Sequence, residues 1–366
     1  MLDNHSLASQ GWKITEPSLS QFTNHNGVFQ DGVLAFCRDC DGVLWLLAGH
    51  TNLGGISLWK GSSVDDLVKQ CDISYNFEMG RAGEAFQGIP YPDGPLSRGQ
   101  IWPNGLWIDP ADGKFYCFIH NETGWGAMDT SYTIQGQQEG EPDFRHIGLI
   151  TSIDQGSNWD FVGWILTSHE PCWTEQYRPD GMVGGQAMNN VNLGAGDFSL
   201  FTNDRDGYFY IFYTQMFWDA EKNQIYDCLY AARASINSKG LPGHWHKYYE
   251  GAYTEPGNLG EETSIVEKGN IPCVSYNTHL NQYMMTSYRR DYWIAEKGAC
   301  QISFSDDLHS WTIPIPLDPE REDLSKPYFT ICNADISGVH HMTGRQFRLF
   351  MESNGTDVYR VDITIA

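Results

Sequence analysis

Three acidic residues are the strongest candidates for chemistry in this sequence, because each stands at one end of an apolar run that predicts a β-strand. Asp31 lies just before VLAF, Glu122 follows FYCFIHN, and Asp197 lies just before FSLF. Carboxyl groups that meet from separate strands can divide the roles of proton donor and base or nucleophile. We expect Asp31 to act as base or nucleophile, with Glu122 or Asp197 as the proton donor.

The surroundings of the two possible donors differ. A Gly-Ala-Gly run precedes Asp197, and we expect its glycines to let a substrate come close to the backbone. Glu122 stands two residues after His120, where partial burial would raise the pKa of the carboxyl group. The sequence does not decide between them. Asp31 itself precedes a glycine, so a simple turn aspartate is an equally good interpretation of that residue.

These acids depend on a repeated element for their positions. Strand pairs joined by tight turns, such as CDG at 40–42, ADG at 111–113 and RDG at 205–207, alternate along the chain with a second kind of hairpin. In the second kind a strand ends at a serine, a polar turn follows, and a tryptophan often comes next. The serines are Ser63, Ser152, Ser235 and Ser305, and the tryptophans are Trp159, Trp245 and Trp311.

Two successive hairpins form a four-stranded antiparallel meander, and radial repetition of such sheets is the β-propeller architecture. The sequence therefore predicts an all-β fold: one domain, residues 1–366, forming a five-bladed β-propeller. The last blade is one strand short, and we expect an N-terminal strand around 11–18 to complete it and so remove an open edge.

In such a blade the first strand lies nearest the axis, so first-strand starts and second-strand ends meet at one opening. Polar and aromatic residues occupy these positions in every predicted blade, and we expect them to bind the substrate. They are His50, Trp102, Asn104, His120, Gln215, Trp218, Arg289, Arg290 and Glu352.

Composition excludes some partners. The formal net charge of −23 disfavours binding to nucleic acid or to an anionic membrane, whereas a neutral carbohydrate is compatible with it. Cys37 and Cys40 have no second ligand pair that would complete a zinc site, so we expect neither a metal nor a cofactor. The N-terminal segment lacks a signal-peptide pattern, which predicts a cytoplasmic protein; a removed leader would instead imply a secreted or periplasmic one.

Several motifs resemble the five-bladed propeller glycosidases, the superfamily of arabinanases, β-xylosidases, β-fructosidases and levansucrases. Asp31 enters the first inner strand, residues 152–159 and 305–311 resemble Asp-box-like hairpins, and residues 245–257 (WHKYYEGAYTEPG) resemble a stretch of bacterial endo-D-arabinanase-related domains. The resemblance implies that Asp31 is a principal catalytic carboxylate and that Asp154 only caps a turn. It also implies an acid where this chain has His50, between Gly49 and Thr51.

Three functions follow as hypotheses. The first is a glycoside hydrolase acting on an oligo- or polysaccharide, which needs two carboxyl groups across the scissile bond. The second is a propeller that binds glycans without cleaving them, because His50 replaces an expected acid. The third is a polysaccharide lyase or isomerase that uses histidine chemistry, with Arg289 or Arg290 neutralising a uronate. The sugar, the linkage and the oligomeric state stay open.

Overall fold

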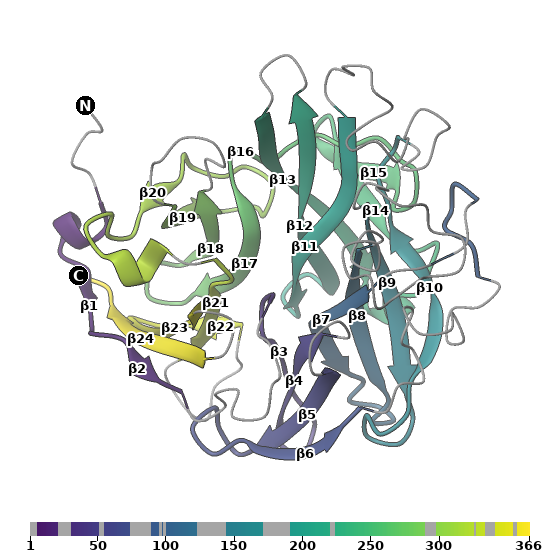
Figure 1. The fold of residues 1–366 in the computed structure, drawn as a ribbon, viewed down its shortest axis with the longest axis horizontal. Coiled ribbons are helices and arrows are strands. Elements are labelled where there is room, and N and C mark those ends of the chain that lie inside the picture. Colours follow the sequence, from purple (N-terminus) through teal and green to yellow (C-terminus); the bar gives the residue numbers. More distant parts are fainter. Residues whose placement is uncertain are drawn as a thin grey trace, which may run out of the picture.

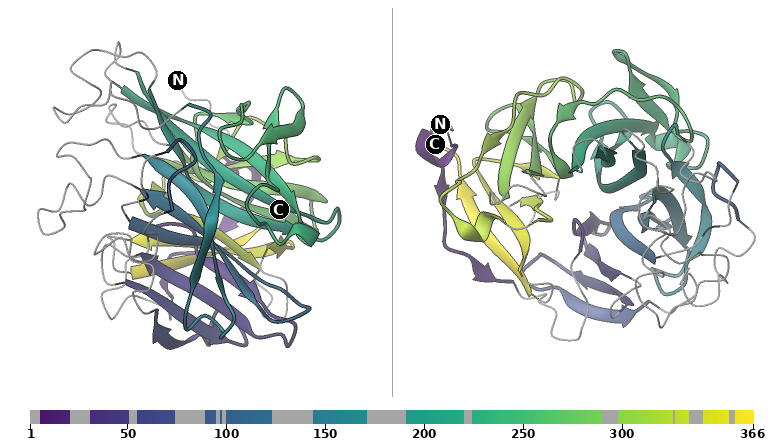
Figure 2. Two further views of the ribbon diagram at one scale, coloured as in Figure 1. Left: turned by 90° about the vertical axis from the view of Figure 1, so that its right-hand side faces the viewer. Right: turned by 45° about the horizontal axis from the view of Figure 1, so that its top comes forward.

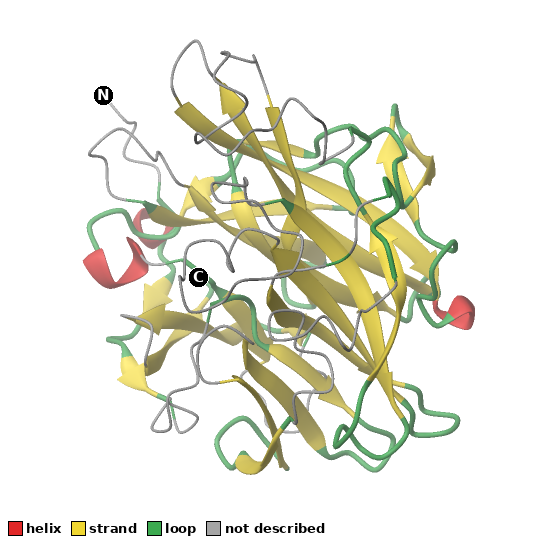
Figure 3. Cartoon of the chain, turned by 45° about the vertical axis from the view of Figure 1, so that its right-hand side comes forward, coloured by secondary structure: helices red, strands yellow, loops and turns green. Residues whose placement is uncertain are grey.

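A computed structural model describes residues 6–20, 31–50, 55–73, 89–94, 97, 100–122, 144–170, 191–219, 224–289, 298–325, 327–333, 341–353 and 357–366. This part of the chain is all-β, as predicted. Its helices are three short 3₁₀ turns, at Ala8–Gln10, Ile236–Ser238 and Glu322–Ser325 (Figure 3). No helix within these ranges is long and apolar enough to cross a bilayer.

The strands form antiparallel units, which we number along the chain (Figure 1). Unit 1 contains β3 (Ala35–Arg38), β4 (Leu44–His50), β5 (Gly55–Gly61) and β6 (Val68–Asp72). Unit 2 contains β7 (Gln100–Ile108), β8 (Phe115–Glu122), β9 (Arg145–Ser152) and β10 (Asp160–Leu166). Unit 3 contains β11 (Val191–Asn203), β12 (Tyr208–Asp219), β13 (Gln224–Ser235) and β14 (His246–Tyr249), with β15 (Ala252–Pro256) and β16 (Val266–Glu267) pairing to β14 and β13.

Units 4 and 5 complete the chain. Unit 4 contains β17 (Asn270–Asn277), β18 (Gln282–Arg289), β19 (Ala299–Ser305) and β20 (Ile315–Pro316), and β22 (Met342–Thr343) pairs with β17. Unit 5 contains β21 (Thr330–Asn333), β23 (Gln346–Ser353) and β24 (Asp357–Thr364). Units 2 and 3 touch through one parallel pairing between β9 and β11.

Turn chemistry explains the hairpins. At the first CDG turn, Asp39 accepts hydrogen bonds from the backbone of Asp41 and Val43, and Gly42 has a φ of +81°, which favours glycine. In the second kind of hairpin, the side chain and backbone of Asn158 donate to Asp154 and lower its pKa to about 2. Asp154 therefore stabilises a turn, as predicted.

The hydrophobic core is divided among the interfaces between units. Five clusters of buried side chains lie between units 1 and 2, 2 and 3, 3 and 4, 4 and 5, and finally 5 and 1. In the last of these, Leu34 and Phe36 of unit 1 pack with Cys332 and Phe350 of unit 5. Each unit thus buries both of its faces against a neighbour, and the units follow one another around a ring (Figure 2).

The two ends of the chain meet in unit 5. β1 (Lys13–Ile14) and β2 (Ser18–Leu19) both pair antiparallel with β24, so the N-terminal segment adds the outer strand that the sequence lacks at its end. A cavity along the middle of the ring is lined by residues from β3, β7, β11, β17 and β21, the first strand of every unit. First strands therefore lie innermost, which is the arrangement that the choice of site residues assumed.

Candidate functional site

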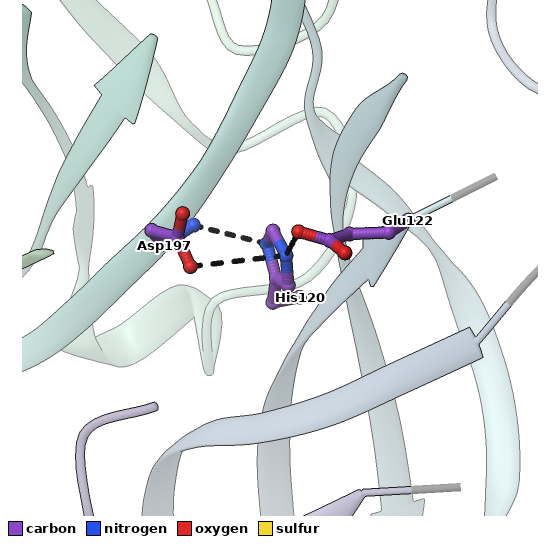
Figure 4. A group of neighbouring side chains, drawn as sticks. All are labelled: His120, Glu122 and Asp197. Atoms are coloured by element: carbon purple, nitrogen blue, oxygen red, sulfur yellow. Dashed lines mark hydrogen bonds and ion pairs between the residues drawn. The ribbon is translucent and has the colours of Figure 1, made fainter. Parts of the chain in front are cut away.

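A polar cluster lies between units 2 and 3 (Figure 4). Unit 2 contributes residues from the end of β8 and the start of β9, and unit 3 contributes a residue from β11. Nε2 of His120 is 3.0 Å from Oε1 of Glu122, and Nε of Arg145 is 3.0 Å from the same oxygen. Nη1 of Arg145 is 3.7 Å from Oδ2 of Asp197. Glu122 and Arg145 are cross-strand partners in the β8–β9 register, which explains why a cation faces this acid.

His120 joins units 2 and 3 through both of its ring nitrogens. The backbone N–H of Asp197 donates to Nδ1 over 3.0 Å (Figure 4). Because a backbone N–H can only donate, Nδ1 must be the unprotonated nitrogen, and the ring proton must sit on Nε2, where it is donated to Glu122. The contacts thus fix a neutral imidazole with one defined tautomer.

The glycines before Asp197 have a different use from the one expected. A Cβ at Gly196 would lie 2.2 Å from Cε1 and 2.5 Å from Nδ1 of His120, and one at Gly194 would lie 2.3 Å from the carbonyl oxygen of Arg145. The space that these glycines free is therefore filled by unit 2. Because these glycines have no side chain, His120 and Arg145 can approach β11 closely. The glycines therefore do not leave room for a substrate.

Asp197 projects from an irregular part of its strand. The β11–β12 register shifts between Gly196 and Ser199, and Asp197 itself has a φ of +40°, an uncommon value for a residue with a side chain. β7 and β17 have a similar irregularity near their starts, at 103–105 and 270–273. Such bulges change the direction in which the side chains of a strand project.

Asp31 reaches the site from unit 1. Its Oδ2 accepts a hydrogen bond of 3.2 Å from the indole N–H of Trp102, whose ring lies 5.2 Å from the ring of His120. Its second neighbour is Tyr328, just before β21 in unit 5, which lies close enough for the two side chains to interact electrostatically. Burial raises the pKa of Tyr328 well above its ordinary value, and the nearby charges of Asp31, Asp197 and Glu122 act in the same direction.

The three carboxylates are held differently. One oxygen of Glu122 meets both the Nε2–H of His120 and the guanidinium of Arg145, and charge-assisted contacts of this kind favour the ionised form. The oxygens of Asp197 are 3.7 Å from Arg145 and 4.0 Å from His120, which is beyond hydrogen-bond distance. Asp197 is therefore the less restrained of the two, and both it and Asp31 are only partly buried.

His120, Glu122 and Asp197 each place one possible ligand atom within 4.8 Å of the others, a spacing that a metal ion could bridge. A neutral histidine that binds a metal through Nε2 must carry its proton on Nδ1. Here Nδ1 already accepts the N–H of Asp197, and the Arg145 cation already binds the Glu122 carboxylate and lies 3.7 Å from that of Asp197. The donor set does not fit a cation.

Several residues predicted to bind substrate are buried. Trp102 is 2% exposed and has no free face on which a sugar could stack; its indole N–H instead holds Asp31. Asn104 is 4% exposed and lies against Gly32. Gln215 is fully buried and contacts Glu262. Successive side chains of a strand point to opposite faces of its sheet. A residue at a strand end can therefore pack against the neighbouring unit instead of facing the axis.

The other predicted residues are less defined. Arg289 ends β18 and is partly buried. His50, Trp218 and Glu352 lie in β4, β12 and β23, but their side chains are outside the described part of the structure, as is all of Arg290.

Arg145 and Tyr328 are the functional candidates that the sequence reasoning did not select. Arg145 begins a third strand, and only first-strand starts and second-strand ends were considered. The feature that could have identified Arg145 is its positive charge, which faces the negative charge of Glu122 across the β8–β9 pair. Tyr328 precedes the first strand of unit 5, and nothing in the sequence places it beside Asp31.

Comparison with known proteins gives a likeness of fold. No protein-family model matches the chain, and no curated relative matches it. Among solved structures, an exo-β-1,3-galactanase from Clostridium thermocellum is 12% identical with a TM-score of 0.50, over 94% of this chain and 61% of that one. The chain therefore spans less than two thirds of that galactanase.

A family 117 glycoside hydrolase from the marine bacterium Zobellia galactanivorans is 11% identical with a TM-score of 0.50, over 97% of this chain and 90% of that one. The predicted resemblance to the propeller glycosidases is thereby confirmed at the level of the fold. The closer resemblance to arabinanase-related domains stays a prediction.

Proposed function

We propose that the five units are the blades of a five-bladed β-propeller, closed by β1, and that the protein is a glycoside hydrolase. The observation that carries the proposal is the convergence of Asp31, Glu122 and Asp197, from three different units, around Tyr328 of a fourth. Hydrolysis of a glycosidic bond requires carboxyl groups on both sides of the bond, and side chains from separate blades can supply them.

The contacts support a division of roles. Asp31 is the base or nucleophile, oriented by the hydrogen bond from the indole N–H of Trp102 and placed beside Tyr328. Asp197 is the proton donor, because neither Arg145 nor His120 is within hydrogen-bond distance of its carboxyl group. Glu122 stays a carboxylate and compensates the charge of Arg145.

The lyase hypothesis has less support from the same geometry. Abstraction of a carbon-bound proton needs a free base, and Tyr328 is poorly suited because its pKa is raised well above the ordinary value. His120 is buried and both of its nitrogens are engaged. A propeller that only binds glycans remains the alternative that the activity experiment decides.

The test is a screen of chromogenic furanosides and pyranosides and of oligosaccharides, followed by kinetics on variants. We expect Asp31→Asn and Asp197→Asn each to lower kcat by about 10²- to 10⁴-fold without loss of folding. Asp72→Asn, which changes an exposed acid on β6, serves as the matched control and should leave kcat unchanged. Full activity in a folded Asp31→Asn protein would disprove the assignment, and binding without turnover in the unmodified protein would favour the glycan-binding alternative.

A further inference from the structure

The cluster between units 2 and 3 contains one group whose role the hydrolytic scheme leaves open. His120 is 2% exposed, and the edge-on indole of Trp102 lies 5.2 Å from its ring. One nitrogen contacts the backbone of Asp197 and the other contacts the side chain of Glu122. A buried imidazole with both nitrogens engaged has no lone pair to offer a substrate, so a direct role as acid or base is not available to it.

The position of His120 in the chain makes it a link between two units. It lies on β8 of unit 2, whereas Asp197 lies in the bulge of β11 in unit 3. The bond to the Asp197 N–H satisfies a backbone donor that the bulge removes from regular pairing with β12. The carbonyl oxygen of Asp197 in turn accepts a hydrogen bond from the hydroxyl of Thr214.

We propose that His120 is a positioning residue, locked as the Nε2–H tautomer, that fixes the Asp197 bulge to the Glu122 carboxylate and thereby orients the proton donor. This inference rests on the proposed role of Asp197 in hydrolysis. This arrangement requires glycine at position 196, because a Cβ there would overlap the His120 ring. A protonated ring would place a hydrogen on Nδ1 against the Asp197 N–H, so the arrangement requires the neutral form.

The tautomer can be tested without any substrate. In ¹⁵N-edited NMR of the imidazole nitrogens at neutral pH, His120 should show a protonated Nε2 and an unprotonated Nδ1. The chain has 12 histidines, and the signal is assigned by its loss in His120→Gln. A proton on Nδ1, or on both nitrogens, would overturn the proposal. Because this measurement does not use turnover, its outcome is separate from that of the hydrolase proposal.

The positioning role is tested by a matched pair of variants. The side-chain amide of His120→Gln can accept from the Asp197 N–H and donate to Glu122, whereas His120→Ala can do neither. We expect His120→Ala to lose about 10²-fold in kcat, because a small displacement of a reacting group has that effect, and His120→Gln to recover most of it. The pH profile of kcat should keep its shape in His120→Gln.

A folded His120→Gln protein that loses as much kcat as His120→Ala, and whose residual activity lacks one limb of the pH profile, would show that the imidazole itself transfers a proton and would refute the positioning role. Thermal unfolding of both variants controls for loss of the fold. If His120→Ala does not fold, the Gln variant and the NMR measurement on the unmodified protein still decide the question.

Discussion

Two polar clusters flank β11 and β12, and they are built from similar residue types. The first is the open cluster of His120, Glu122, Arg145 and Asp197. The second, which we call the closed cluster, consists of Lys247, Glu262 and His169. Each combines a cation, a histidine and at least one carboxylate, yet they differ in how completely their hydrogen-bonding groups are used.

In the closed cluster the side chain of Lys247 is fully buried, and Nζ donates to the carbonyl oxygens of Thr167 and Gly260 and to Glu262. Three donors therefore meet three acceptors. Burial alone would raise the pKa of Glu262, but the hydrogen bond from His169 and the charge of Lys247 outweigh it and hold this pKa below its ordinary value. A cluster that is satisfied in this way stabilises structure and has nothing left to offer a ligand.

The open cluster keeps one carboxyl group, that of Asp197, outside such contacts. The difference teaches that residue type does not distinguish a cluster whose hydrogen bonds are all made from one in which a carboxyl group lies beyond hydrogen-bond distance of its charged neighbours. What distinguishes them is whether each polar atom already has its partner, and three variants test this distinction.

The largest expected effect is on the closed cluster. Lys247→Met leaves the Glu262 charge buried without its main counter-ion and should lower the free energy of unfolding by about 3–5 kcal/mol, measured by chemical denaturation. Adding Glu262→Gln should recover part of this loss. The control Lys69→Met breaks an exposed pair with Asp72 and should change stability by less than about 1 kcal/mol. Equal effects of the two lysine variants would contradict the structural role of the closed cluster.

A smaller effect is expected from Gly196→Ala in the open cluster. Its Cβ must displace His120, and such overpacking costs about 1–3 kcal/mol of stability, with a loss of kcat if His120 positions Asp197. Gly344→Ala is the control, since a Cβ there meets only Oγ1 of Thr278, at 3.8 Å. Thermal unfolding and kinetics measure both. Unchanged activity in the Gly196→Ala protein would show that the contact between β8 and β11 does not matter for the reaction.

The smallest expected effect is on pH dependence. The hydrogen bond to Glu262 raises the pKa of His169. Its stabilising contribution is therefore complete below the ordinary histidine pKa of about 6.5 and is lost as pH rises through the raised value. Unfolding free energies of the unmodified protein and His169→Gln should differ by under about 1 kcal/mol near pH 6, and the difference should shrink by pH 8.5. If the difference in unfolding free energy between the two proteins grows with pH, the pKa of His169 is not raised by folding.

Much of the fold followed from short-range signals. Glycine at 42 and the aspartates at 39 and 154 specify turns by local bonding, and apolar runs of the right length specify the strands between them. The pairing of the N-terminal segment with β24 was predicted because the last unit lacked a strand.

The candidate site was only partly predictable. The strand-end rule selected Asp31, Glu122 and Asp197, but which side of a strand end faces the axis depends on bulges that the sequence does not reveal. Trp102 and Gln215 were therefore expected to bind the substrate, although the structure buries both. Contacts between units, such as the one between Tyr328 and Asp31, depend on the closed ring and have no local signal.

That last contact has a consequence for biosynthesis. Of the five units, Asp31 belongs to the first to be synthesised and Tyr328 to the last, and the same seam is joined by Leu34 with Thr330 and by Asp65 with Arg348. Unit 1 can make these contacts only after the residues of unit 5 have been synthesised. The seam between units 5 and 1 is therefore completed last, and the hydrolase activity proposed above would report on its completion.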